Sequence, residues 1–538
     1  MAAEPVFVVF EGGGAKGVAH LGALAALEAA EDAGAIRVRG YAGTSAGAIV
    51  AALAASGWRS HEIVSREDRT DILRRLGRKY GTPERRATDL LGTEGWRAVR
   101  RLRDLGRLRL WLPIYGSVVL TTCAVLYGLI VAPPIPADWL IGVLAALTLV
   151  VAGLGWRLGL ARALDLTRGF ANLDGLVRLL NTALADKLNI PTDQQVTFAD
   201  IAARTRLKIV ASDLEAGHVR LFPDRPADEE IPVAVAVAAS ACIPFVFGAQ
   251  RIGERYHVDG GLISNLPAWA FDYELRLEEE ASVLAFQIQD GGPSASVLVR
   301  LLRTAVFGGK PMALRNIPQL VTGPLPSRLG VLDFDASFET ICQEIDEARC
   351  RARDLMVPLT EYPARFEGLA ARARDLFGEY VSEVQVRLGA ERYGGTVRAS
   401  FAVPFGEPVI GLRHRYSAGY EDTADARLAL PLKNSICGAA YARPETGGIA
   451  IADLRQPLRD DVSLSWPEYR IAKNRAAAVT LSFVAAIRIE IPNLVGGVAE
   501  AYVLQIDGTE PVDLSPDTLR AILVLVRREI LAELDGLA

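Results

Sequence analysis

Near the N-terminus, two short apolar segments each lead into a glycine-rich turn and then into an alanine-rich helical pattern. The first apolar segment, residues 6–10, is followed by "EGGGAKG" and by apolar residues at helical spacing from about residue 15. The second, about residues 38–42, is followed by "GTSAG" and "AIVAAL". Short apolar runs bounded by glycine indicate buried strands, and the spacing after them indicates helices. The sequence thus predicts a strand, a tight turn and a helix twice within 56 residues.

The first turn predicts an anion site. Successive glycines free backbone N–H groups to face one point at a helix N-terminus, where the helix dipole also favours negative charge. Gly12, Gly14 and Gly17 fit G-x-G-x-x-G, but the second strand ends in Tyr-Ala-Gly, without the acidic residue that a dinucleotide site needs for the ribose. A nucleoside triphosphate loop is excluded because Lys16 is followed by glycine, not by Ser or Thr.

The second turn fits the G-x-S-x-G elbow, in which a serine sits on a strained turn between a strand and a helix. Gly43 and Gly47 flank Ser45 and would let strand and helix approach closely. Ser45 or Thr44 could equally be an ordinary N-cap of the following helix. The pentapeptide alone leaves both interpretations open.

A third element, "YHVDGGLISNLP", favours the interpretation of Ser45 as a nucleophile. A short strand there delivers Asp259 to a Gly260-Gly261 turn. An ionised carboxylate within hydrogen-bond reach can take the proton of a serine hydroxyl directly, so a histidine is not required. The five histidines offer no convincing Ser-His-Asp set; we expect a structural role for His257 and a packed position for His20.

The combination of an early GGGAKG, a GTSAG elbow and a late DGG resembles the patatin-like phospholipases. "AASACIPFVF", "NLP" and a closing helix within "VLDFDASFETICQEIDEAR" add to the resemblance, which covers roughly residues 5–60 and 205–355. It implies an α/β fold, a sandwich around a mostly parallel sheet, and hydrolysis of acyl esters by a Ser-Asp dyad. It implies no cofactor and no metal ion.

Carried over to this chain, the resemblance makes Ser45 the nucleophile and Asp259 the base that activates first the serine and then a water molecule. The backbone amides of the glycine loop, Gly13 and Gly14 foremost, would form the oxyanion hole. The full set of expected oxyanion-hole residues is Gly12, Gly13, Gly14 and Ala15, and the motif-supporting residues are Lys16, Gly17, Gly43, Gly47, Gly260 and Gly261.

Between the elbow and the aspartate lie two uncharged apolar runs, residues 111–132 and 139–156, of 22 and 18 residues. Crossing a bilayer core takes roughly 20 apolar residues. The link "PPIPAD" is short and has no Lys or Arg, whereas arginines stand on both outer flanks. By the positive-inside rule, residues 110–157 are predicted to form a transmembrane hairpin with both ends in the cytoplasm. Two helices buried in a soluble core are the alternative.

Charge and cysteine content further restrict the classes of function that the chain could have. Residues 74–109 hold twelve Lys and Arg against four acidic residues, which suits an anionic leaflet or simply a solvated helical face. The whole chain has a net charge of −5, so it carries no footprint of a nucleic-acid binder. Its five cysteines are scattered, without the paired spacing of a zinc site. The N-terminus lacks the basic region of a signal peptide.

In the last third of the chain the sequence pattern changes and predicts alternating strands, glycine turns and a final helix. The order of these segments resembles a GAF-type sensor domain over residues 365–538, and an accessory α+β domain without a ligand is the alternative. If the resemblance holds, it implies binding of a small-molecule regulator or self-association. The expected domains are therefore an acyl hydrolase domain at 1–355, the hairpin at 110–157 inserted in it, and the C-terminal domain.

Together these features predict a membrane-anchored lipid acyl hydrolase, with membrane lipids as substrate and both domains in the cytoplasm. A lipid-sensing regulatory protein that uses the hydrolase fold for binding is a second hypothesis. Transfer of the acyl group to an acceptor other than water is a third, which the sequence does not separate from hydrolysis.

Overall fold

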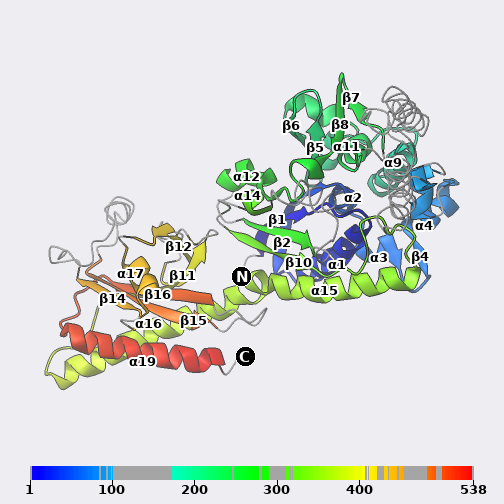
Figure 1. Ribbon diagram of the computed structural model, residues 1–538. Coiled ribbons are helices and arrows are strands. Elements are labelled where there is room, and N and C mark those ends of the chain that lie inside the picture. The colour runs from blue at the N-terminus through cyan, green and yellow to red at the C-terminus, as the bar shows by residue number, and fades with distance from the viewer. Residues whose placement is uncertain are drawn as a thin grey trace, which may run out of the picture. The chain divides into compact units, whose positions relative to one another are not determined.

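The computed structural model describes residues 3–535 apart from 101–171, 290–309, 421–428, 454–480, 492–499 and several gaps of one to three residues (Figure 1). The chain divides into two compact units. The N-terminal unit comprises Pro5–Ala313 and Val321–Arg353, and the C-terminal unit comprises Asp354–Ala538 with Met1–Glu4 and Leu314–Leu320.

The N-terminal unit is built on a mixed sheet. Strands β1 and β9 pair in parallel, as do β2 and β5, whereas β5 pairs antiparallel with β6 and β8, and β7 with β8. In sheet order the strands are β10 (Leu320–Leu325), β9 (Ser282–Ile288), β1 (Glu4–Phe10), β2 (Ile36–Thr44), β5 (Arg206–Asp213), β8 (Arg255–Asp259) and β7 (Gln250–Ile252), with β6 (His218–Phe222) beside β5.

The α/β architecture is confirmed, but the expectation of a mostly parallel sheet needs correction. Chain segments 214–217 and 253–254 join β5 to β6 and β7 to β8. Connections this short permit only antiparallel pairing, because a parallel crossover needs a dozen or more residues. The antiparallel strands lie at the side of the sheet that contains Asp259.

Strand β1 is buried on both faces. Phe7 stacks on Phe271 of η5 (Ala268–Phe271), with ring centroids 4.4 Å apart. Phe10 contacts His20 of α1 (Ala19–Asp32) at 5.1 Å between centroids. Side chains three positions apart on a strand point to opposite faces, so these contacts place η5 and α1 on opposite sides of the sheet.

Three helices pack together around the strand that precedes the elbow. α2 (Ala46–Ser56) contacts β2 and β5, and α9 (Asp174–Leu188) and α11 (Val233–Ser240) contact α2 and each other (Figure 1). Smaller elements of the unit are η1 (Gly14–Val18), α3 (Ser60–Ile63), β3 (Val64–Ser65), β4 (Thr70–Asp71), α4 (Ile72–Tyr80), η2 (Ala87–Leu91), α10 (Phe198–Ala202), η3 (Pro226–Glu230), η4 (Gly260–Leu262), α12 (Asp272–Leu277) and α14 (Lys310–Ala313).

The helix expected within residues 331–349 is α15 (Phe338–Thr360). It begins seven residues into that segment, where the Ser337 hydroxyl accepts a hydrogen bond from the Thr340 N–H at 3.1 Å. Gly22 of α1 lies directly against it, since a Cβ on Gly22 would stand 2.3 Å from the Ile345 carbonyl oxygen. The absence of a side chain on Gly22 therefore permits this close helix packing.

The C-terminal unit is a six-stranded sheet with helices on both faces. The helices α16 (Tyr362–Arg387) and α19 (Pro516–Asp535) cover one face, and α17 (Ile436–Ala442) covers the other. All of its resolved strand pairs are antiparallel. In sheet order the strands are β13 (Ala429–Pro431), β12 (Gly411–Ala418), β11 (Val397–Phe405), β16 (Glu500–Gly508), β15 (Phe483–Ile491) and β14 (Ile449–Asp453).

The predicted hairpin, residues 110–157, lies outside the described residues. Across the ranges that the structure does describe, no helix combines the length and the apolar character needed to span a membrane.

Candidate active site

Ser45 occupies a strained turn between β2 and α2. Its backbone has φ 53° and ψ −121°, a region that residues other than glycine rarely adopt. The turn fits only because its flanking glycines lack side chains: a Cβ on Gly43 would lie 2.4 Å from the backbone of Gly47, and one on Gly47 would lie 2.3 Å from the Phe10 carbonyl oxygen. Ser45 makes no side-chain capping hydrogen bond to α2, so its geometry is that of an elbow.

A buried serine on a neighbouring helix holds the elbow in place. The Ser45 N–H donates to Ser240 Oγ at 2.8 Å, and the Ser240 hydroxyl donates to the Val210 carbonyl oxygen at 2.6 Å. On the other side, the Thr44 hydroxyl donates to the Ser264 carbonyl oxygen at 3.0 Å. Hydrogen bonds that involve β5, α11 and the loop after Asp259 therefore hold Ser45 in its strained conformation.

Asp259 ends β8 beside the elbow and is buried, with 8% of its surface exposed. Its carboxylate accepts a hydrogen bond from the Gly261 N–H at 2.7 Å, and the Ser45 side chain lies close enough to influence its pKa. Burial raises the pKa of Asp259 from 3.8 to about 6, although the Gly261 N–H and the Ser45 side chain both act to lower it. The structure therefore brings together the two residues that the sequence singled out, across 214 positions of chain.

The glycine loop lies against Ser45, since a Cβ on Gly12 would be 3.2 Å from that of Ser45. Two of its four candidate oxyanion donors are engaged: the Gly12 N–H donates to the Asn265 carbonyl oxygen at 3.0 Å, and the Ala15 N–H to the Val331 carbonyl oxygen at 2.9 Å. Within the described ranges, the N–H groups of Gly13 and Gly14 have no hydrogen-bond acceptor. These two amides are the available donors.

Asn265 and the buried Glu11 form a clamp beneath this loop. Asn265 Nδ2 donates to Glu11 Oε1 at 2.8 Å and to the Gly12 carbonyl oxygen at 3.0 Å. Glu11 also accepts from the Ile288 N–H at 2.6 Å and pairs with Lys310 at 2.8 Å. Burial raises the pKa of Glu11, while Lys310 opposes that rise. Asn265 stands in the "NLP" segment and Glu11 precedes the glycines, yet neither role was predicted from the sequence.

The motif-supporting residues pack around the same point. Lys16 is buried and donates from Nζ to the Gln289 carbonyl oxygen at 3.1 Å, so its charge stays beside the loop. A Cβ on Gly17 would lie 2.5 Å from that of Ala46, one residue after the elbow serine. A Cβ on Gly260 would lie 2.3 Å from the Val210 carbonyl oxygen, and one on Gly261 would lie 2.8 Å from the Asn265 side chain and 2.9 Å from the Asp259 side chain.

Neither of the two buried histidines of the N-terminal unit, His20 and His257, forms a hydrogen bond with Ser45. His20 is fully buried on α1 and bonds the Glu11 carbonyl oxygen at 2.8 Å, and burial lowers its pKa to about 4. His257 lies 4.0 Å from the Asp213 carboxylate and packs on Phe222. No group of three potential metal ligands occurs among the residues with described positions.

Comparison with known proteins identifies a family for most of the N-terminal unit. Residues 8–272 match the family model of the patatin-like phospholipases. These residues therefore form a domain of the patatin-like phospholipase family.

The individual proteins that this chain resembles have low sequence identity to it. YqhO of Bacillus subtilis strain 168, an uncharacterized protein, is 28% identical over 275 residues, which cover 49% of this chain and 66% of YqhO. VipD from Legionella pneumophila is 16% identical, with 72% of this chain and 78% of VipD covered and a TM-score of 0.32. The GAF domain of a sensor histidine kinase from Bacillus halodurans is 15% identical, with 30% of this chain and 93% of that domain covered and a TM-score of 0.20.

Proposed function

We propose that this protein hydrolyses ester-linked fatty acyl chains of phospholipids or neutral lipids through a Ser45–Asp259 dyad. The observation that carries the proposal is the position of the elbow serine, Ser45, beside the buried carboxylate of Asp259, whose pKa is raised to about 6 by burial and is lowered in part by the Ser45 side chain. A base with a pKa just below neutral is mostly ionised at pH 7, yet basic enough to take a proton in the transition state.

In this mechanism Ser45 Oγ attacks the ester carbonyl carbon while Asp259 takes the hydroxyl proton. The carbonyl oxygen becomes an oxyanion that the N–H groups of Gly13 and Gly14 stabilise, and donors of this kind contribute about 3–4 kcal/mol each. Collapse of the tetrahedral intermediate expels the alcohol, which takes the proton from Asp259, and leaves an acyl-serine. Asp259 then deprotonates a water molecule, which attacks the acyl group and regenerates the serine.

The clamp of Glu11 and Asn265 would act indirectly, by fixing the loop that presents those amides. Asn265 is bonded to both sides of Gly12, through its own carbonyl and through its side-chain amide. Donors held in place before the reaction need no reorganisation when charge develops on the substrate oxygen. Loss of Asn265 should therefore lower kcat through the loop without removing any reacting group.

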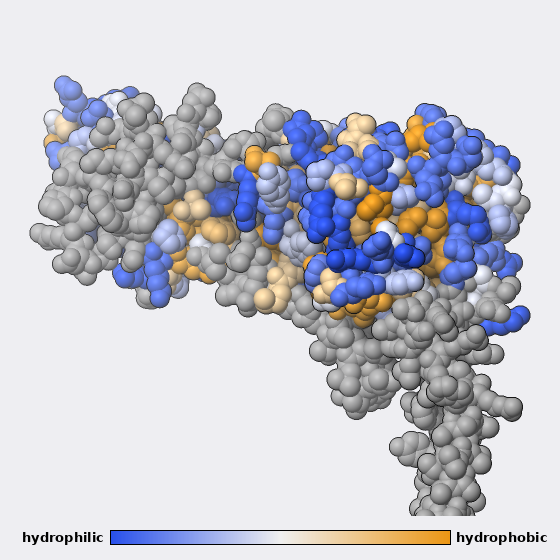
Figure 2. Space-filling view, turned by 90° about the horizontal axis from the view of Figure 1, so that it is seen from above, coloured by the Kyte–Doolittle hydropathy of each residue, from blue (hydrophilic) through white to orange (hydrophobic). Residues whose placement is uncertain are grey.

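A lipid substrate is supported by apolar residues beside the base. Leu262 and Ile263 follow the Asp259-Gly260-Gly261 turn and are 38% and 45% exposed. On the face seen in Figure 2, hydrophobic patches interrupt the hydrophilic surface of the N-terminal unit. Exposed apolar surface of this kind marks sites of contact with lipid or protein.

Membrane attachment through residues 110–157 is part of the proposal and rests on the two apolar runs and their arginine-rich flanks. Both domains, 1–355 and 365–538, would then lie on the cytoplasmic side. The C-terminal domain is proposed to bind a small-molecule regulator or to self-associate. Covalent labelling discriminates between an enzyme and a lipid-binding module built on the same fold.

We would treat the detergent-solubilised chain with a fluorophosphonate and map the adduct by mass spectrometry. The proposal predicts that Ser45 alone is modified and that Asp259→Asn abolishes the labelling. Ser56 is a buried serine at the far end of α2, and the Ser56→Ala variant should label normally. Absence of an adduct on Ser45 in the folded wild type would favour the binding-module hypothesis. Added acceptor alcohols would then separate hydrolysis from acyl transfer.

A further inference from the structure

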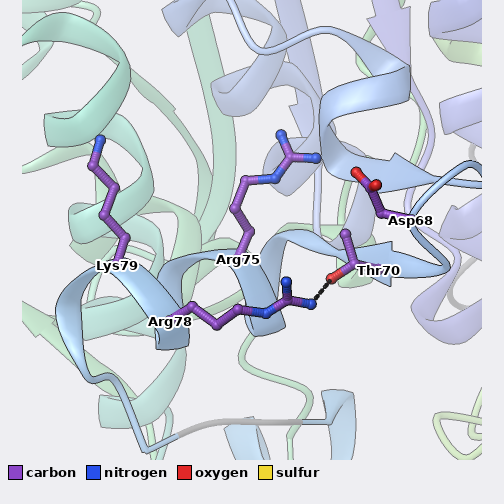
Figure 3. Close-up of a pocket in the computed structure, with 5 residues that line it drawn as sticks. All are labelled: Asp68, Thr70, Arg75, Arg78 and Lys79. Carbon is purple, nitrogen blue, oxygen red and sulfur yellow. Dashed lines mark hydrogen bonds between the residues drawn. The ribbon is translucent and has the colours of Figure 1, made fainter.

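A basic pocket lies on a part of the N-terminal unit that the mechanism does not use. It has a volume of about 300 Å³ and is lined by Asp68, Thr70, Arg75, Arg78 and Lys79 (Figure 3). Thr70 is the first residue of β4, and the three cationic residues belong to α4. Helix α4 contacts α9, which in turn contacts α2 behind the elbow. None of the residues that line the pocket belongs to the Ser45 site, so the pocket is a separate feature.

Positions three and four apart on a helix share one face, and Arg75, Arg78 and Lys79 follow this spacing. Figure 3 shows the guanidinium groups of Arg75 and Arg78 projecting towards the side of the pocket that holds Thr70 and Asp68. Lys79 lies on the side of the view away from Thr70 and Asp68 and pairs with Asp186 of α9 at 2.5 Å. Two guanidinium groups thus supply the donors inside the pocket.

Neighbouring arginines are already neutralised, and Arg75 is not. Arg66 pairs with Asp346 at 2.6 Å and Arg69 pairs with Glu339, both on α15. Arg78 is held by the neutral Thr70 hydroxyl, which accepts from its Nη2 at 3.1 Å. The half-buried Arg75 has no hydrogen-bond or ion-pair partner in the described parts of the chain.

Asp68 is the one carboxylate that lines the pocket, and it bonds Ser65 without forming an ion pair with Arg75. Apart from Lys79, which pairs with Asp186, the lining carries the two positive charges of Arg75 and Arg78 against the one negative charge of Asp68. Planar guanidinium groups with several N–H donors match the oxygen atoms of a phosphate group, and charge-assisted bonds of this type are among the stronger ones in proteins. From this arrangement we propose that the pocket binds a phosphate group, as a lipid headgroup or as a free phosphate.

The test uses the full chain in neutral detergent, in a Ser45→Ala background so that no lipid is turned over. Inorganic phosphate, glycerol phosphate and dihexanoyl phosphatidate are titrated by calorimetry. Saturable binding that weakens with added salt is expected. Tighter binding of phosphatidate than of the other two assigns the site to a lipid headgroup; equal or tighter binding of inorganic phosphate assigns it to free phosphate.

Arg75→Gln and Arg74→Gln form a matched pair. Arg74 is the next residue of α4 but lies outside the pocket lining, with its side chain bonded to the Arg69 carbonyl oxygen at 3.3 Å. Arg75→Gln should weaken binding about tenfold or more, and Arg74→Gln by less than about threefold. Asp68→Asn should tighten binding about two- to fivefold, because it removes a repelling charge.

Circular dichroism and thermal unfolding confirm that the variants are folded. The inference is wrong if the folded protein binds none of the three probes, if Arg75→Gln and Arg74→Gln bind alike, or if Asp68→Asn weakens binding. Fatty acid release is not used as a readout, so this result is independent of the proposed dyad.

Discussion

The raised pKa of Asp259 predicts how activity depends on pH. Its folded-state pKa is about 6, because the carboxylate is buried beside the elbow. At pH 7 about ten molecules are ionised for each protonated one, and at pH 5 the ratio is reversed. Since only the carboxylate can take the proton of Ser45, kcat/KM on a soluble butyrate ester should fall about tenfold between pH 7 and pH 5.

Stability should change in the opposite direction. The folded protein binds the Asp259 proton more tightly than the unfolded chain, whose pKa is near 3.8. Between about pH 4 and pH 6 the native state therefore carries the extra proton, and the free energy of unfolding decreases as pH rises through this window. The full contribution is on the order of 3 kcal/mol, from about 1.4 kcal/mol per pKa unit.

Asp259→Asn tests both statements together. The amide is neutral at every pH, so this variant should be nearly inactive and yet more stable than wild type at pH 7 in urea unfolding. Initial rates of butyrate release, measured by chromatography from pH 4.5 to 8, give the profile. A wild-type profile that is flat between pH 5 and pH 7, or an inflection that survives Asp259→Asn, would refute the reasoning.

Two further predictions concern the elbow itself. Ser240→Ala leaves the Ser45 N–H buried without its acceptor and should destabilise the protein by about 1–3 kcal/mol. It should also lower kcat more than it raises KM. Ser56→Ala, the control, also removes a buried hydroxyl that is bonded to a carbonyl oxygen, but it should leave kcat unchanged. Equal kcat values for the two variants would contradict this. Gly43→Ala places a Cβ 2.4 Å from backbone and should cost several kcal/mol by urea unfolding, while Gly368→Ala, in open space on α16, should stabilise by about 0.5–1 kcal/mol. A Gly43→Ala protein of wild-type stability would show that the elbow relaxes.

Local sequence signals predicted the local geometry of the site well. The positions of the two turns follow from glycines placed between an apolar strand and a helical pattern, and both helices begin next to them. Glycine at 43 and 47 reports a close approach of backbones, which is a local requirement that one sequence can display. The serine of the second turn and the strand that ends at Asp259 were found by the same kind of signal.

Contacts between distant segments were not predictable in the same way. The hydrogen bond from Asn265 to Glu11 joins residues 254 positions apart, and Ser240 reaches Ser45 across 195 positions. A buried carboxylate next to a glycine loop offered the only signal, because such a group needs partners. The antiparallel side of the sheet was not predicted, although the short connections at 214–217 and 253–254 require antiparallel pairing.

Fatty acid release from mixed phospholipid vesicles tests the central claim most directly, with the purified full chain compared beside Ser45→Ala and Asp259→Ala. The account predicts that wild type releases free fatty acid and that both variants, folded by circular dichroism, fall to background. Equal release by all three proteins would contradict it, because the proximity of Ser45 and Asp259 would then be structural only.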